Sequence, residues 1–365
     1  MKFAALIRSS LRRGAAPGVV AAITMSLAAC GDAESPADPD APGTGAPVDA
    51  PVTPQPDTEV IVGEWSPDVN DDLPWRFLAS ELDHIGRGRF WERPWEQGNR
   101  HGTNPIIAIS AYHDALDALG VRLIVVPVPP KASVFPDQLP EEVEQPHPVD
   151  EFYDLLRANG VELVDLLPGL QVERIDSPNQ IYCKTDTHWS PSTGAIAART
   201  VAAMISDEPW AAALADAGRF VVQPEAVLAF HGDLLEDGEK TPDMLERLPI
   251  HQVTDRDQPN EPVAHDPASP VMVIGDSHAM VFSTGGDMHA TGAGFVDHLQ
   301  AALGFPVDVS ANRGSGIDAA RGSVARRSVQ EPDLWEDKKV VIWLFTAREF
   351  TQGRWVEIPP KVEQP

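Results

Sequence analysis

Residues 271–278 read Val-Met-Val-Ile-Gly-Asp-Ser-His, a run of four apolar residues that leads directly into a glycine. Such a run is typical of a strand buried on both faces, as in a parallel sheet. The glycine predicts a tight turn that lifts the hydroxyl of Ser277 out of the sheet edge. A serine becomes a nucleophile only when a base takes its proton and N–H donors hold the resulting oxyanion. Most Gly-Asp-Ser tripeptides are ordinary turns, so the rest of the chain has to supply these partners.

Helix, glycine and apolar strand alternate in other parts of the chain. Residues 105–119 carry apolar side chains at helical spacing, and Gly120 and an apolar strand at 121–127 follow them. The same order recurs as a helix over 154–159 and a strand over 161–167. This alternation predicts an α/β domain built on a mostly parallel sheet.

Three strands after residue 270 are predicted to end in polar turns. The first ends at Ser277, the strand over 305–310 ends at the glycine turn 312–316, and the strand over 339–345 ends at residues 346–348. The carboxyl ends of parallel strands meet at one edge of a doubly wound sheet. We therefore expect the serine, the backbone N–H groups of the glycine turn and the polar side chains after the last strand to lie together.

Asp186 and His188 are the candidates for the base. Ser190 is predicted to cap a helix that begins at Pro191, which leaves both residues on a loop fixed by that helix. An aspartate two residues before a histidine can orient the imidazole while its other nitrogen works as a base. Taken alone, the stretch is better explained as a loop histidine with a local hydrogen bond to the aspartate.

Residues 206–268 are acidic and rich in proline, with no convincing buried strand apart from residues 220–222. This composition predicts helices and an irregular excursion, in the manner of an insertion or lid. His231 and Asp233 lie within it, either near the site or as structural caps.

Residues 71–100 are rich in tryptophan and arginine. These aromatic side chains would suit a groove for sugar rings, but packing at the edge of the domain is the more common role for them. The arginines of this stretch are interpreted as solvated or structural.

The first 29 residues have the character of a secretory signal. Four basic residues precede an apolar run over 19–29, and Leu-Ala-Ala-Cys closes the run at Cys30. This ending resembles a bacterial lipobox, in which Cys30 is lipidated and becomes the mature N-terminus; an uncleaved anchor or a chance apolar start is the alternative. Gly31 favours sorting to the outer membrane, so the expected location is the periplasm, with a lipid anchor in that membrane. Residues 30–60, with seven prolines between Pro36 and Pro56, are predicted to form an extended tether before a domain over 61–365.

The net charge and the cysteine content argue against several kinds of binding partner and against disulfide bonds. The formal charge is −27. Without the signal the chain carries 24 basic and 55 acidic groups, a net charge of −31. Such a balance argues against nucleic acid as a partner and against electrostatic binding to anionic lipid. Cys183 is the only cysteine besides Cys30, so a lipidated chain forms no intrachain disulfide. Nothing in the sequence indicates a cofactor.

An ordered set of short motifs resembles the SGNH hydrolase superfamily, and within it the branch that O-acetylates alginate and other exopolysaccharides. In most of the superfamily Asp-x-x-His follows the serine; here, as in that branch, Asp-x-His precedes it. The motifs span residues 100–350: Val126-Pro-Val-Pro-Pro-Lys131, Thr185-Asp-Thr-His-Trp189, His231-Gly-Asp-Leu234, Gly275-Asp-Ser277, Arg313-Gly-Ser-Gly316 and Ile342-Trp-Leu-Phe-Thr-Ala-Arg-Glu349.

The resemblance implies a three-layer α/β/α fold and a serine-dependent acyltransferase. Ser277 would be the nucleophile, His188 the base and Asp186 its orienting carboxylate, while His278 is only a neighbour of the serine. The oxyanion donors would be backbone N–H groups of Ser277 and of Gly314 or Gly316. The usual asparagine after the last strand is missing, and Arg348 or Asn312 is expected to replace it. The implied partners are an acetyl donor, a polysaccharide and a membrane-bound O-acyltransferase.

Three other functions remain open at this level. Water instead of a sugar would make the protein a carbohydrate acetylesterase. The missing asparagine would also suit a catalytically decayed, polysaccharide-binding assembly lipoprotein. Finally, the pairs Asp186/His188 and Asp276/His278 would suit a dinuclear metal centre, although the further histidine motifs of metallophosphatases are not found.

Overall fold

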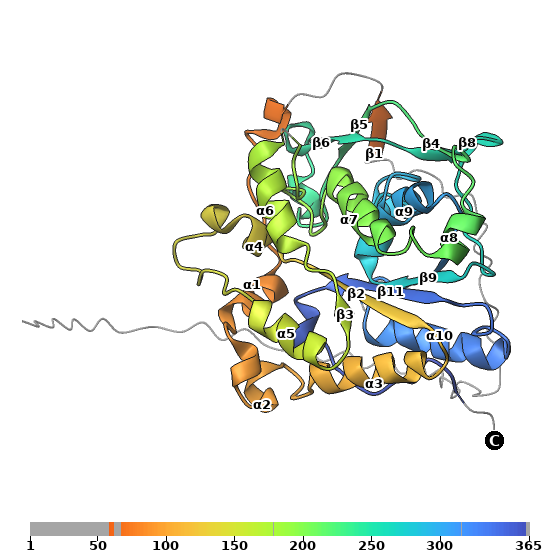
Figure 1. Cartoon of the computed structure of the whole chain (residues 1–365). Helices are drawn as coiled ribbons and strands as arrows, with labels where there is room; N and C mark the ends of the chain where they lie inside the picture. Colours follow the sequence, from red (N-terminus) through yellow and green to blue (C-terminus); the bar gives the residue numbers. More distant parts are fainter. Residues whose placement is uncertain (1–57, 62–66, 178, 315, 363–365) are drawn as a thin grey trace, which may run out of the picture. The chain divides into compact units, whose positions relative to one another are not determined.

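A five-stranded parallel sheet forms the centre of the computed structural model, which describes residues 58–61, 67–177, 179–314 and 316–362. Its strand order is β10-β9-β11-β2-β3 (Figure 1). The strands are β2 (Arg122–Val128), β3 (Glu162–Leu163), β9 (Val271–Gly275), β10 (Asp308–Ala311) and β11 (Val340–Thr346). The predicted mostly parallel sheet is confirmed.

Alternate residues of the three inner strands pack into two separate cores, because successive side chains of a strand point to opposite faces. On one face Val273 and Ile342 join the first core, and on the other Ile274 and Trp343 join the second. Every residue of β9 and β11 is buried. This double burial is why both strands are continuous apolar runs in the sequence.

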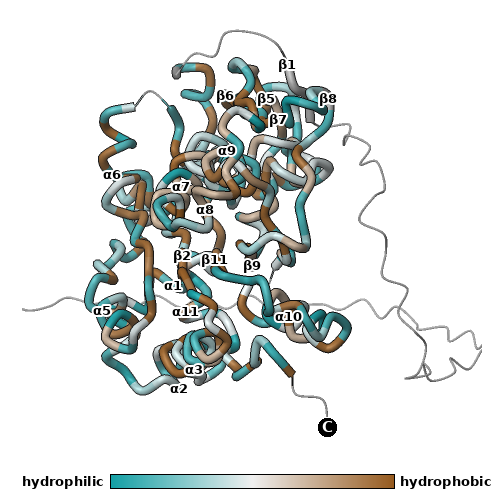
Figure 2. The backbone as a smooth tube through the Cα atoms, turned by 45° about the vertical axis from the view of Figure 1, so that its right-hand side comes forward, coloured by the Kyte–Doolittle hydropathy of each residue, from teal (hydrophilic) through white to brown (hydrophobic). Residues whose placement is uncertain are grey.

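Helices cover both faces of the sheet, so the three-layer α/β/α expectation is confirmed (Figure 1). One layer holds α3 (Pro105–Asp117), α5 (Asp150–Ala158) and α10 (Asp318–Gln330). The other holds α6 (Leu167–Asp176), α7 (Pro191–Ala203) and α9 (Phe295–Leu303). In Figure 2 α5 alternates between apolar and polar colours, since Phe152 and Leu156 face the core while Asp154 and Arg157 face solvent.

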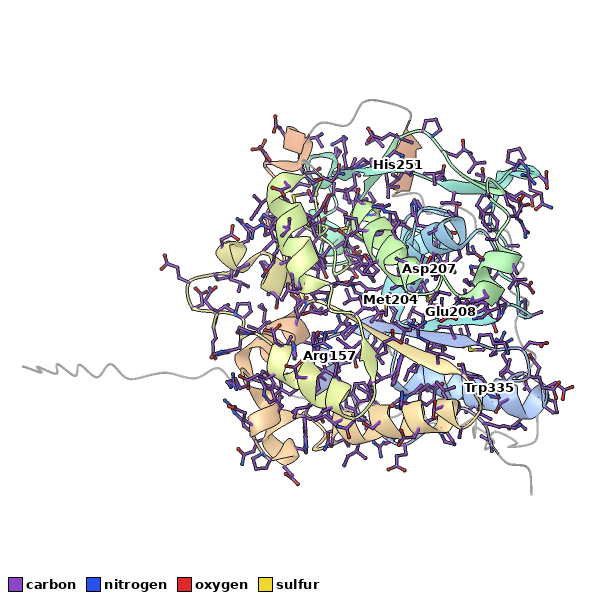
Figure 3. The ribbon with its side chains drawn as sticks, in the orientation of Figure 1. Arg157, Met204, Asp207, Glu208, His251 and Trp335 are labelled. Carbon is purple, nitrogen blue, oxygen red and sulfur yellow. The ribbon has the colours of Figure 1, made fainter. Side chains whose placement is uncertain are left out.

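The cap predicted for the helix at Pro191 is present. Ser190 Oγ accepts a hydrogen bond of 3.3 Å from the Thr193 N–H, and Pro191 occupies the first turn of α7. The other end of this helix is tied to the sheet by Arg122, which donates to the Met204 carbonyl at 2.9 Å and lies 3.8 Å from Glu208. Figure 3 labels Met204 and Glu208.

For residues 206–268, the strand expected over 220–222 is present, but the prediction of helices and irregular chain for the rest of the segment was wrong. This segment has the short helix α8 (Pro209–Leu214) and five strands. Together with β1, these strands form two separate antiparallel sheets. One sheet consists of β1 (Thr58–Ile61), β5 (Ala226–Phe230) and β6 (Glu246–Ile250). The other consists of β4 (Phe220–Val222), β7 (Val253–Asp255) and β8 (Gln258–Pro262).

Tertiary pairing explains this outcome, because each strand is short and prolines such as Pro249 hide the alternation in the sequence. Helix α7 packs against β6 and α9 against β4, which places both sheets beyond this helical layer (Figure 1). Strand β1 begins at Thr58, three residues before the predicted domain boundary. The signal segment, Cys30 and the tether up to residue 57 lie outside the described residues.

Aromatic side chains of residues 71–100 pack at the edge of the domain. Phe90 is buried, its ring centroid is 4.9 Å from that of Phe152, and Trp91 and Trp95 pack against the same core. Of the two interpretations for this stretch, the structure supports packing. Among the described residues, no helix has the length and apolar character needed to cross a bilayer.

Candidate active site

Ser277 begins a single 3-10 turn (Ser277–Ala279) directly after β9 and Asp276. A Cβ atom on Gly275 would lie 2.7 Å from the carbonyl oxygen of Leu344, so only glycine allows β9 and β11 to approach at this point. Ser277 is partly exposed between two buried neighbours, Asp276 and His278. The serine is therefore presented at the carboxyl edge of the sheet, as expected from the sequence.

Asp276 fastens this turn to the neighbouring strand. One carboxylate oxygen accepts the His278 N–H at 2.8 Å, and the other accepts the Thr346 N–H at the end of β11 at 2.7 Å. Burial alone would raise the pKa of Asp276, but the hydrogen bonds and charge of His278, with the charge of Arg348, lower it to about 2. Asp276 is thus an ionised carboxylate that holds the turn in place.

Asp186 is completely buried and accepts four hydrogen bonds. Oδ1 accepts His188 Nδ1 at 2.6 Å and the His188 N–H at 3.0 Å. Oδ2 accepts the Asp233 N–H at 2.9 Å and His289 Nε2 at 2.8 Å. Burial would raise the pKa of Asp186, but the charges and hydrogen bonds of His188 and His289 hold it well below its usual value.

The imidazole ring of His188 lies against the serine turn. The Nε2 atom is buried and has no hydrogen-bond partner among the described residues. The imidazole centroid lies 4.8 Å from that of His278, the residue after Ser277. Burial lowers the pKa of His188, but the charge and hydrogen bond of Asp186 outweigh burial, so this pKa lies above its ordinary value. The loop and the serine turn, about ninety residues apart in sequence, meet here.

Two further segments hold the Asp186 loop. Lys131 donates from Nζ to the Asp186 carbonyl oxygen at 2.6 Å. A Cβ atom on Gly232 would lie 2.2 Å from the Thr185 carbonyl oxygen, so this glycine allows the segment after β5 to lie against the loop. Asp233 then accepts the N–H and the hydroxyl of Thr187, each at 2.7 Å.

His231 and Asp233, which the sequence placed either near the site or in structural caps, differ in position. Asp233 lies next to the site, and its Oδ2 is 3.9 Å from His188 Nδ1. His231 instead bonds through Nε2 to the Thr241 carbonyl at 2.8 Å, as a structural contact.

His278 is a buried neighbour of the serine. Its Nδ1 lies 3.4 Å from Asp276 Oδ1 and its ring stands edge-on to Trp189, with centroids 5.4 Å apart. Burial lowers the pKa of His278 to about 4 despite the opposing effect of Asp276. The ring is therefore neutral near pH 7.

The glycine turn after β10 packs against the serine turn. A Cβ atom on Gly316 would lie 2.7 Å from the Asp276 Cβ, and Gly314 has φ +72°, which favours glycine. Asn312 donates its backbone N–H to Gly275 and directs its amide nitrogen to Ser323 Oγ on α10 at 3.3 Å. Its side chain is therefore engaged with the helix.

Arg348 lines a small pocket at the same edge of the sheet, together with Thr346, His278 and Glu81. Its nearest carboxylate contact is a distance of 3.8 Å from Nε to Glu349. Of the two residues expected to replace the missing asparagine, only Arg348 lines this pocket.

Asp186, His188 and Asp233 are also the one described group whose ligand atoms lie within 4.8 Å of one another, as a metal ion would require. Both oxygens of Asp186 already accept two N–H donors each, so a cation would have to displace them. The pair Asp276/His278 is not part of this group. The arrangement fits a hydrogen-bonded acid–base pair better than a dinuclear centre.

His289 had no signal in the sequence. It lies in a glycine-rich stretch 103 residues after Asp186, in no recognisable motif. Only the tertiary contact identifies it.

Comparison with known proteins gives a family match over most of the chain. The model described as "SGNH hydrolase-like domain, acetyltransferase AlgX" matches residues 93–351. A protein named probable alginate O-acetylase AlgJ, from Pseudomonas syringae pv. tomato, is 25% identical over 75% of this chain and 66% of its own length. The protein of the same name from Pseudomonas fluorescens is 26% identical over 57% of this chain and 52% of its own length.

The chain thus spans about half to two thirds of these two curated relatives. A solved structure, the O-acetyltransferase domain of Pseudomonas putida AlgJ, covers 80% of this chain and 92% of its own, with a TM-score of 0.51 and 20% identity. At this identity the likeness concerns the fold.

Proposed function

The chain belongs to the SGNH hydrolase-like acetyltransferase AlgX family, and from this we propose that it is an exported O-acetyltransferase that acetylates a polysaccharide through an acetyl-serine intermediate. The observation that carries the proposal is the Asp186–His188 pair, joined at 2.6 Å. The Nε2 atom of His188 has no partner among the described residues, and the ring centroid lies 4.8 Å from that of His278, next to Ser277. Relatives named as probable alginate O-acetylases point to an alginate-like exopolysaccharide as the acceptor.

In the first half-reaction His188 Nε2 takes the hydroxyl proton of Ser277 while Oγ attacks the carbonyl carbon of the acetyl donor. Asp186 holds Nδ1–H and stabilises the imidazolium that forms. The imidazolium then gives the proton to the leaving group, and the acetyl group remains on Ser277. In the second half-reaction His188 takes the proton of a sugar hydroxyl, whose oxygen attacks the acetyl carbon. The bond from the acetyl carbon to Ser277 Oγ then breaks, and the imidazolium returns the proton to Oγ.

The oxyanion of both steps requires N–H donors in fixed positions. We assign the backbone N–H of Ser277 and one from Gly314 or Gly316 to this role, because the two turns pack against each other. Arg348 is assigned as the third donor in preference to Asn312, whose amide nitrogen bonds to Ser323.

The central test uses purified protein and a small chromogenic acetyl ester, with and without acetylatable oligosaccharides. Wild-type protein should release the chromophore, whereas Ser277→Ala and His188→Ala should lose activity by at least about a thousandfold. Ser206→Ala, which changes a serine at the end of α7, serves as the matched control and should retain activity. Activity that persists in Ser277→Ala would contradict the proposal.

Product analysis separates the transferase from the esterase. Mass spectrometry should detect acetylated oligosaccharide from wild-type protein and none from Ser277→Ala. Acetate as the sole product with every acceptor would assign the esterase instead, and no Ser277-dependent product at all would favour the polysaccharide-binding lipoprotein.

The proposed location is the periplasm, with a lipid on Cys30 that anchors the protein to the outer membrane. Support comes from the basic, apolar and Leu-Ala-Ala-Cys segments of the first 30 residues. An acetyl donor and a membrane-bound O-acyltransferase are the proposed partners. Metabolic labelling with a fatty acid should mark the wild-type chain and not Cys30→Ser, and membrane fractionation should follow the label.

A further inference from the structure

His289 lies at the centre of a strained turn. It has φ +71° and ψ −62°, and the Ala290 N–H bonds across it to the Met288 carbonyl at 2.9 Å. This is a γ-turn of the rarer kind, with a positive φ that a residue with a side chain seldom adopts. Strain of this type persists only where the surrounding structure imposes it, and it is often found at functional sites.

Packing holds the imidazole in one orientation. Its centroid lies 4.3 Å from the ring of Phe230 and 5.7 Å from that of Phe282. Phe282 itself has φ +61°, so the two described non-glycine residues with positive φ pack against each other. The side chain of His289 is only 8% exposed, and Nε2 points at Asp186 Oδ2, 2.8 Å away.

The same turn reaches the other side of the site. Asp287, two residues before His289, forms a two-pronged ion pair with Arg313. Arg313 begins the glycine turn that packs against Asp276. One short segment therefore contacts both the carboxylate of the Asp186–His188 pair and the turn assigned to the oxyanion.

We propose that His289 is a positioning residue that donates a hydrogen bond to the second oxygen of Asp186 and thereby sets how strongly Asp186 attracts the proton of His188. This inference rests on the proposed function, in which His188 is the base. The N–H of His289 draws negative charge toward Oδ2 and away from Oδ1, the oxygen that faces His188. Without this donor, Oδ2 would retain only the Asp233 N–H.

Other charged and titratable groups also face the pair, and a substitution at His289 leaves these residues themselves unchanged. Asp233 lies on the segment after β5, Asp276 and His278 lie on the serine turn, and Lys131 donates to the Asp186 carbonyl from the start of α4 (Lys131–Val134). A shift on changing His289 alone can therefore be assigned to its own hydrogen bond.

The test is a proton NMR titration of the His188 ring in the full chain, with the His188 signal identified by its loss in His188→Gln. His289→Phe keeps a ring between Phe230 and Phe282 but removes the donor, whereas His289→Gln keeps an N–H near the position of Nε2. We expect the His188 midpoint to rise by roughly half a unit or more in His289→Phe and to stay near the wild-type value in His289→Gln. In the pH–rate profile of ester hydrolysis, the rise in activity on the acidic side should shift in the same direction.

An unchanged midpoint in His289→Phe would overturn the inference. So would a lower midpoint, because it would mean that Asp186 had moved away and that His289 merely supports the loop. If His289→Phe does not fold, His289→Met provides the donor-free variant and is read in the same way. The titration needs no turnover, so an inactive wild-type protein would contradict the proposed function and leave this test intact.

Discussion

Lys131 donates a hydrogen bond of 2.6 Å from its ammonium group to the main-chain carbonyl of Asp186. The side chain is buried, and Nζ also donates to the Arg76 carbonyl at 2.8 Å. Burial lowers the pKa of Lys131, and Glu81 opposes this shift by its charge. A buried cation is thus used to hold the backbone of the loop that carries Asp186 and His188.

Replacing this lysine should weaken both the fold and the reaction. Lys131→Met leaves the buried carbonyl of Asp186 and the partly buried carbonyl of Arg76 without this donor, and an unsatisfied buried group costs about 1–3 kcal/mol before relaxation. We expect a free energy of unfolding reduced by at least about 2 kcal/mol in urea, together with a lower kcat. Lys240→Met is the matched control, since Lys240 makes only a surface pair with Asp237 at 3.5 Å, and it should change stability by less than about 0.5 kcal/mol.

Gly232→Ala should disturb the Asp186 loop from the other side. The new methyl group would lie 2.2 Å from the Thr185 carbonyl oxygen and 2.6 Å from the Asp186 N atom, so the two segments must separate. Overpacking of this kind costs about 1–3 kcal/mol. Thermal unfolding and ester hydrolysis should both decline, while Gly238→Ala, which has open space around it, should behave like the wild type. Equal behaviour of the two variants would contradict the close approach.

The activity should rise with pH through the titration of His188. The base must be neutral, and Asp186 raises the pKa of His188 against the effect of burial, so the acid limb should lie above the ordinary histidine value of about 6.5. In Asp186→Asn this limb should move to lower pH, and kcat should fall by several orders of magnitude because the ring loses its orientation. A pH–rate profile of kcat/KM measures both effects. A limb that stays in place in Asp186→Asn would assign it to another group.

The Asp186–His188 pair also predicts the direction in which the stability of the folded protein changes with pH. Because the pKa of His188 is raised in the folded protein, its contribution to stability is complete below pH 6.5 and is lost as the pH rises through the folded value. The difference in free energy of unfolding between the wild-type protein and His188→Gln should therefore decrease as the pH increases above 6.5, as measured by urea unfolding. A difference that grows with pH would contradict the raised pKa.

Arg348 and Asn312 should differ as oxyanion donors. Arg348→Met should lower kcat by about 10²–10³-fold, the effect of losing one such donor, with a smaller change in KM. Asn312→Ala should change kcat little, because its amide nitrogen bonds to Ser323. Steady-state kinetics with the acetyl ester compares the two, and a larger effect at Asn312 would reverse the assignment.

Local sequence signals were enough for the elements that need no distant partner to be recognised. Strands β9 and β11 are continuous apolar runs because both of their faces are buried, and Ser190-Pro191 marks the start of α7 because a cap and a first-turn proline act within four residues. Apart from residues 220–222, the strands of residues 220–262 left no such signal. They are short, several are partly exposed, and their pairing with β1 and with one another defines them.

The sequence by itself determined the α/β class, the serine turn after a buried strand and the candidate pair Asp186 and His188, since each is encoded by neighbouring residues. Tertiary structure alone decided that Asp233 and His289, 47 and 103 residues away, share the second oxygen of Asp186. It also decided that Arg348 lines the pocket beside His278 while Asn312 bonds to α10. The physical reason is that a hydrogen bond depends on distance and direction in space, and spacing along the chain carries no information about contacts made by separate turns.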